Sequence, residues 1–174
     1  MLIPGFLIAW ITFPGVIVHE FGHRLFCNLT DTPVRQVCYF RFGNPAGYVI
    51  HEQPDSAWKH ILIGIGPLIV NSTFGFVIGF GAILNPWKAE GLGIITTSIL
   101  IWLAVSIAMH SFPSRVDADG IWSAVYDNEA PAIARAVAFP LVVLIYLGAI
   151  GSIFWLDLAY GAAVAWWLPG QLLA

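Results

Sequence analysis

The sequence His19-Glu20-Phe21-Gly22-His23 is the pattern in this chain with the clearest chemistry. Residues four apart share one face of a helix, so the imidazoles of His19 and His23 can bind one metal ion. Glu20 follows the first histidine and is not needed as a ligand. In this pattern the carboxylate polarises the water at the metal and moves its proton. The motif therefore predicts a zinc hydrolase site with Glu20 as general base.

A third ligand must come from elsewhere, because catalytic zinc usually has three protein ligands and a water. The candidate region is 110–120, where Pro113 ends an apolar run and is followed by Asp117 and Asp119. Either carboxylate can be the ligand, and either can be the N-cap of the helix that follows. For His110, a hydrogen bond to backbone or to a ligand is expected ahead of metal binding.

The composition indicates what surrounds this site. Hydrophobic residues make up 59% of the 174 residues and charged residues only 10%, whereas a soluble domain usually carries about 25% charged residues. The mean hydropathy is +0.82. Net charge is −3 with only seven Lys and Arg and no basic cluster, which excludes a nucleic-acid role. We expect an integral membrane protein in contact with the lipid bilayer.

Apolar runs define the expected fold, because about 20 apolar residues in a helix cross the bilayer. We predict one domain over residues 1–174, an all-α multi-pass membrane protein with four to five transmembrane helices. The expected spans are about 2–26, 58–84, 92–109, 133–155 and a shorter one at 158–168. The ionisable residues of the first motif lie near the end of the first span, where charge in lipid is costly and indicates function. Alternatively, they lie past the lipid boundary and cap the helix.

The polar stretch 28–57 carries a pattern of strands. Residues 37–42 are rich in β-branched and aromatic types, and the turn sequence 43–47 precedes Tyr48-Val49-Ile50. This predicts a short re-entrant β-hairpin at about 37–50, between the first and second spans.

In the second span, Gly66-Pro67-Leu68-Ile69-Val70-Asn71 places a proline and a polar amide at membrane depth. Pro67 is expected to bend the helix and free backbone carbonyls, and Asn71 can donate hydrogen bonds there. The plainer alternative is a kink with helix packing through small residues.

Positive residues predict the orientation. Those that flank the first and third loops are Arg24, Arg35, Arg41, Lys59, Arg115 and Arg135, and only Lys88 lies in the second loop. By the positive-inside rule, the first and third loops face the cytoplasm. We expect a multi-pass protein of the cell membrane with its site towards the cytoplasmic side.

Three motifs together resemble those of the site-2 protease family of intramembrane zinc metalloproteases. HEFGH, GPLIVN and HSFPSRVDADG occur in the family's order over about 100 residues, and Gly47-Tyr48-Val49 looks like the family's hairpin element. The third motif departs from the family's Asn-Pro…Asp-Gly form, because no Asn precedes Pro113 and two Asp compete. The resemblance implies His19 and His23 as zinc ligands and Glu20 as general base. It favours Asp117 as third ligand, with Asp119 as the alternative.

Two functions follow as expectations. The first is hydrolysis of a transmembrane protein or peptide substrate, with an unwound segment held by strand addition at residues 47–49 and with Asn71 binding its backbone or the oxyanion. The second is a catalytically inactive membrane scaffold or binding protein that retains a protease-like metal site. A transporter is disfavoured, because no inverted repeat of broken segments is visible.

Overall fold

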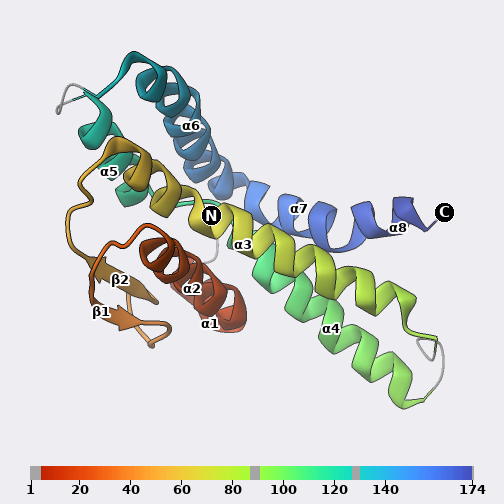
Figure 1. Ribbon diagram of the computed structural model, residues 1–174. Helices are drawn as coiled ribbons and strands as arrows, with labels where there is room; N and C mark the ends of the chain where they lie inside the picture. The colour runs from red at the N-terminus through yellow and green to blue at the C-terminus, as the bar shows by residue number, and fades with distance from the viewer. Residues whose placement is uncertain (1–4, 87–90, 127–129, 174) are drawn as a thin grey trace.

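A computed structural model describes residues 5–86, 91–126 and 130–173. The chain is mostly helical, with one two-stranded sheet beside the second helix (Figure 1). Its elements, in chain order, are α1 (Gly5–Ile11), α2 (Phe13–Leu29), β1 (Val34–Cys38), β2 (Tyr48–His51), α3 (Ala57–Leu84), α4 (Leu92–Met109), α5 (Arg115–Tyr126), α6 (Ala132–Gly151), the 3₁₀ turn η1 (Ser152–Phe154), α7 (Leu156–Ala162), the π-helical turn η2 (Ala163–Trp167) and α8 (Leu168–Leu172).

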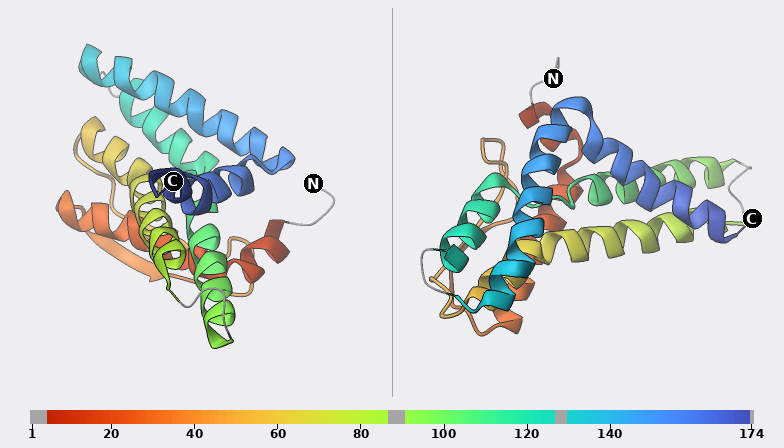
Figure 2. Two further views of the ribbon diagram at one scale, coloured as in Figure 1. Left: turned by 90° about the vertical axis from the view of Figure 1, so that its right-hand side faces the viewer. Right: turned by 90° about the horizontal axis from the view of Figure 1, so that it is seen from above.

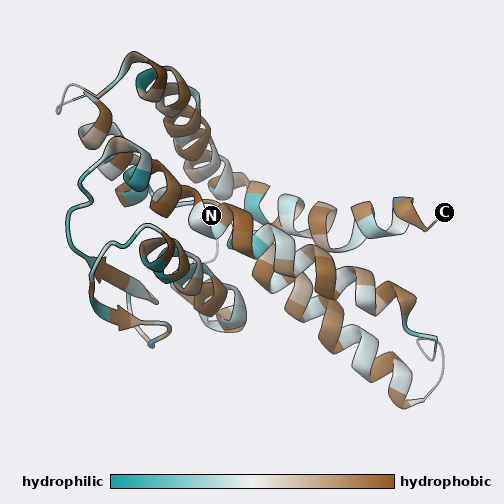
Figure 3. Cartoon of the chain, viewed as in Figure 1, coloured by the Kyte–Doolittle hydropathy of each residue, from teal (hydrophilic) through white to brown (hydrophobic). Residues whose placement is uncertain are grey.

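Three helical segments have the length and apolar composition of membrane spans: Ala57–Leu84, Leu92–Met109 and Ala132–Phe154. They cover the ranges expected for the second, third and fourth spans. Large apolar side chains on their outer faces are exposed, among them Phe74, Ile94 and Leu144, and hydrophobic colour extends over these helices in Figure 3. Such a surface is costly in water and favourable in lipid.

The first expected span, over residues 2–26, is not one continuous helix in the described residues, because the chain bends by 92° between α1 and α2. The bend lies at Thr12, whose hydroxyl donates to the Ile8 carbonyl at 2.6 Å. Pro14 follows in the first turn of α2, where the N–H that proline lacks would have no helical partner, so proline favours the start of a new helix there. Residues 2–4 lie outside the described residues. Counting this bent pair as one span gives up to four spans.

The last expected span, 158–168, is divided among α7, η2 and the start of α8. None of these pieces alone is long enough to cross a membrane. Pro169 has no N–H for the carbonyl one turn earlier, which accounts for irregular helix just before it. Together the pieces pack along α3 and α4, as the right-hand view of Figure 2 shows.

Pro67 does not break the second span, since α3 continues through it from Ala57 to Leu84. Instead α3 passes close to α2 at Pro67. A Cβ added to Gly22 would lie 2.9 Å from the Pro67 Cα atom, so only glycine allows this approach. The first and second motifs are therefore in backbone contact, as small residues permit between membrane helices.

The expected hairpin is confirmed as an antiparallel pair, with Val37 opposite Val49 and Cys38 opposite Tyr48. Its first strand begins earlier than expected, at Val34, and ends at Cys38. The sheet packs against α2, which carries the first motif.

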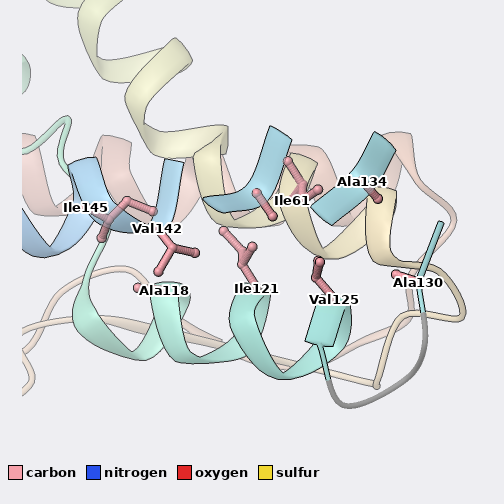
Figure 4. Close-up of a cluster of buried hydrophobic side chains, with 9 residues drawn as sticks. Ile61, Ala118, Ile121, Val125, Ala130, Ala134, Val142 and Ile145 are labelled. Atoms are coloured by element: carbon pink, nitrogen blue, oxygen red, sulfur yellow. The ribbon is translucent and has the colours of Figure 1, made fainter. Parts of the chain in front are cut away.

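A buried apolar cluster packs α5 against α3 and α6 (Figure 4). Ile121 and Val125 of α5 have almost no exposed surface, and they pack with Ile61 of α3 and Val142 of α6. This cluster fixes the position and rotation of α5, and with it the carboxylates at its start.

Candidate metal centre

His19 and His23 of α2 meet Asp117 of α5. One possible ligand atom from each residue lies within 4.8 Å of the other two. His23 Nε2 is 3.2 Å from His19 Nε2 and 3.5 Å from Asp117 Oδ1. The structure thus brings together the three residues that the sequence proposes as ligands.

The other nitrogen of each histidine is held by backbone. His19 Nδ1 donates to the His110 carbonyl at 2.7 Å, and His23 Nδ1 donates to the Ile63 carbonyl at 3.0 Å. With hydrogen on Nδ1, the Nε2 atom of a neutral imidazole carries a lone pair. Two lone pairs facing each other at 3.2 Å repel unless a positive ion lies between them. Carbonyl-oriented histidines of this kind are typical of metal sites.

His110 itself bonds to backbone, as expected. Its Nδ1 donates to the Ser106 carbonyl at 3.0 Å, and its own carbonyl accepts from His19. It therefore positions a ligand through its main chain.

Asp117 is oriented by Ser114, which precedes α5. The backbone N–H and the hydroxyl of Ser114 both donate to Asp117 Oδ2 at 2.7 Å, and the Asp117 N–H donates back to Ser114 Oγ at 3.2 Å. This is a capping box. The expectation that an aspartate is the N-cap is wrong, because Ser114 has that position and Asp117 is three residues into the motif. Oδ1 remains on the side of His23.

Asp119 is not part of this group. It accepts a hydrogen bond from Tyr146 of α6. Residues two apart on a helix point about 200° from each other, so α5 cannot direct both carboxylates to the histidines. The geometry favours Asp117 over the alternative.

Glu20 lies largely buried, with 8% of its surface exposed, beside the hairpin. A Cβ added to Gly47 would be 2.7 Å from Glu20 Cγ and 3.0 Å from its Oε1 atom. Within the described parts of the chain, no side chain or backbone group bonds to this carboxylate. Because β2 begins at the next residue, Tyr48 and Val49 follow directly from the point of contact with Glu20.

A cavity of about 330 Å³ opens beside His19 and Glu20. Its lining includes Gly47 of the hairpin and residues from the end of α6, from η1 and from the start of α7, namely Gly148, Ser152 and Asp157. A cavity of this size accommodates a small ligand or one side chain.

Asn71 lies apart from the group. It has no exposed surface, and its Nδ2 donates to the carbonyls of Gly15 in α2 and Ile107 in α4, both at 3.0 Å. It therefore joins three helices and is not among the residues that line the cavity. Its contact with a substrate stays a prediction.

Sequence reasoning missed Ser114 and the cavity-lining residues Gly148, Ser152 and Asp157. The spacing Ser114-x-x-Asp117 is that of a capping box and could have indicated the helix start. An isolated acid in a long apolar stretch is a functional signal at membrane depth, which could have indicated Asp157. No pattern indicates Gly148 or Ser152.

The ligand set fits zinc. Tetrahedral zinc with bonds of about 2.0–2.1 Å places its ligand atoms about 3.3 Å apart, and the two shortest separations here are 3.2 and 3.5 Å. Two imidazole nitrogens and a carboxylate oxygen also suit its coordination preference.

Comparisons with protein-family models, with curated proteins and with solved structures found no match to this chain. What the site can do is therefore inferred from its own residues and geometry.

Proposed function

We propose that this chain is an intramembrane zinc metalloprotease that hydrolyses peptide bonds of membrane-embedded or membrane-proximal substrates. The observation that carries the proposal is the meeting of His19, His23 and Asp117 beside the buried carboxylate of Glu20. This group lies in a helical chain whose long helices have the character of membrane spans.

His19 Nε2, His23 Nε2 and Asp117 Oδ1 are the atoms that would hold the metal. When bound, zinc supplies a Lewis acid that polarises a carbonyl and brings the pKa of a water towards ~7. The carbonyls of His110 and Ile63 accept hydrogen bonds from the two histidines, and Ser114 donates to Asp117. These bonds keep the three ligands in place.

The role of Glu20 in this proposal is proton transfer. It borders the cavity that a substrate would enter, and it is free of protein partners among the described residues. In the reaction it accepts a proton from the attacking water and passes it to the leaving amine, as a general base and then a general acid.

The hairpin presents the substrate in extended form. A helical substrate hides its carbonyls in i to i−4 bonds, so it must unwind locally before attack. Residues 47–49 stand next to Glu20 and could add the unwound segment as a further strand. Substituting Val49→Pro, with zinc content as a check on folding, should lower cleavage. Full turnover would exclude strand addition at this strand.

We place the protein in the cell membrane, with the hairpin side towards the cytoplasm, because of the distribution of positive residues. In a background of Cys27→Ala and Cys38→Ala, single cysteines test this orientation. A membrane-impermeant maleimide added to intact cells should label Leu92→Cys and leave Asp55→Cys unlabelled. The reverse pattern would invert the topology.

The central experiment is zinc content of the detergent-purified protein, measured beside proteolysis. We expect about one zinc per chain, because the described residues hold one set of three possible ligands. His23→Ala should lose both zinc and cleavage, whereas Glu20→Gln should keep zinc and lose cleavage. A cellular phenotype left unchanged by Glu20→Gln would instead favour a scaffold. A wild-type chain that binds no transition metal would refute the proposal.

A further inference from the structure

The lining of the cavity beside Glu20 includes a second carboxylate. Gly148 and Ala149 of α6 and Ser152 of η1 contribute little bulk there, and Asp157 of α7 adds a carboxylate. A second, smaller cavity of about 160 Å³ reaches towards α1 and also contacts Ser152 and Asp157. Asp157 therefore lies where the two cavities meet.

This carboxylate forms no ion pair among the described residues, and the imidazole of His110, which lines both cavities, is the group that interacts with it electrostatically. The described ion pairs are His23–Asp117, Arg35–Glu52 and Lys59–Asp55. The backbone N–H of its neighbour Leu158 donates a hydrogen bond to Asp157 Oδ1 at 2.9 Å. An unpaired acid among apolar helices is costly unless a cavity or a ligand stabilises it.

We propose that Asp157 is a specificity-determining residue that binds the ammonium or guanidinium group of a substrate Lys or Arg next to the cleaved bond. This inference rests on the proposed function, because the side chain enters from a peptide held at His19 and Glu20. The cavity suits such a side chain along its length. Met109 and Phe112 line the cavity and offer apolar surface to the aliphatic stem, and the carboxylate of Asp157 in the same lining can bind the charged end.

A structural role of Asp157 at the start of α7 predicts something different. An acid in the first turn stabilises a helix by about 0.3–1 kcal/mol through the helix dipole and has no effect on which peptides are cut. The experiment must therefore measure selectivity together with folding.

The first test maps cleavage sites on reduced, carboxymethylated lactalbumin, an unfolded protein, with the zinc-loaded full chain in detergent. We expect Lys and Arg to be enriched about tenfold at one position flanking the cleaved bonds, the effect of one charge-assisted hydrogen bond. Asp157→Asn should remove this enrichment and keep zinc content. Asp157→Lys should shift the preference to Asp and Glu. Asp31→Asn is the matched control, because it removes the same charge from an exposed turn after α2.

The second test measures binding without cleavage. In the Glu20→Gln variant, a fluorescent alanine-leucine peptide with one lysine should bind about tenfold more tightly than the same peptide with norleucine. Adding Asp157→Asn should abolish the difference. This comparison remains informative if lactalbumin is not cut, an outcome that would count against the proteolytic function. Equal affinity of the two peptides for the Glu20→Gln variant, or cleavage without basic preference, would overturn the inference and leave the proteolytic function standing.

Discussion

Ser114 holds one oxygen of Asp117 and leaves the other to the histidines. Both donors of Ser114 lie 2.7 Å from Asp117 Oδ2, while Oδ1 is 3.5 Å from His23 Nε2. One motif thus starts α5 and orients a metal ligand. Partners of this kind fix the rotamer of a ligating carboxylate.

Removing the Ser114 hydroxyl should weaken the metal site. We expect Ser114→Ala to lower zinc affinity about 10- to 100-fold, the usual loss when a partner of a ligand is removed. Competition with a zinc chelator measures this. Ser56→Ala is the control, because Ser56 is the N-cap of α3 and accepts from the Lys59 N–H. If both variants lost zinc affinity equally, the loss would come from helix capping and not from the orientation of Asp117.

Substitutions of the two aspartates of α5 should have different effects on zinc binding. Asp117→Asn removes the anionic ligand and should abolish tight zinc binding, whereas Asp119→Asn changes only the link to Tyr146. Zinc content of both purified variants decides between them. Zinc kept by Asp117→Asn and lost by Asp119→Asn would show that the ligand is Asp119.

Gly47 should be needed for catalysis and not for metal binding. The Cβ of Gly47→Ala would lie 2.7 Å from Glu20 Cγ, so the base must move away. We expect turnover to fall by about 10²-fold or more, since a displacement of about 1 Å has such effects, with zinc content unchanged. Gly43→Ala is the control, because its Cβ would meet nothing closer than 3.4 Å. Normal turnover in Gly47→Ala would show that Glu20 is not held by this contact.

Asn71 should stabilise the helix bundle. Asn71→Ala removes two buried hydrogen bonds, to the carbonyls of Gly15 and Ile107, and each such bond contributes about 0.5–1.5 kcal/mol to stability. We expect a melting temperature several degrees lower in detergent. Turnover per folded molecule distinguishes this role from oxyanion binding: a large loss of kcat at unchanged stability would place Asn71 at the substrate.

Features that depend on short-range sequence patterns could be predicted from the sequence. A four-residue spacing puts His19 and His23 on one helix face regardless of the rest of the fold, and long apolar runs predict helices with the character of spans at 58–84, 92–109 and 133–155. The hairpin was also predictable, because alternating β-branched and aromatic residues around a Gly-Pro turn favour paired strands. Its exact start was not, because Val34 pairs through contacts with β2 and α2.

Apolar runs and the four-residue spacing of two histidines are enough to predict membrane-type helices and a shared metal ion. Which carboxylate lies beside these histidines depends on the packing of the helices. Asp117 and Asp119 differ by two residues, and the choice depends on the rotation of α5, which the packing of Ile121 against α3 and α6 fixes. The same holds for Asn71, buried between three helices, and for Asp157, which reaches the cavity through the fold of α6 and α7. Contacts between distant segments depend on how whole helices pack, and no local pattern encodes them.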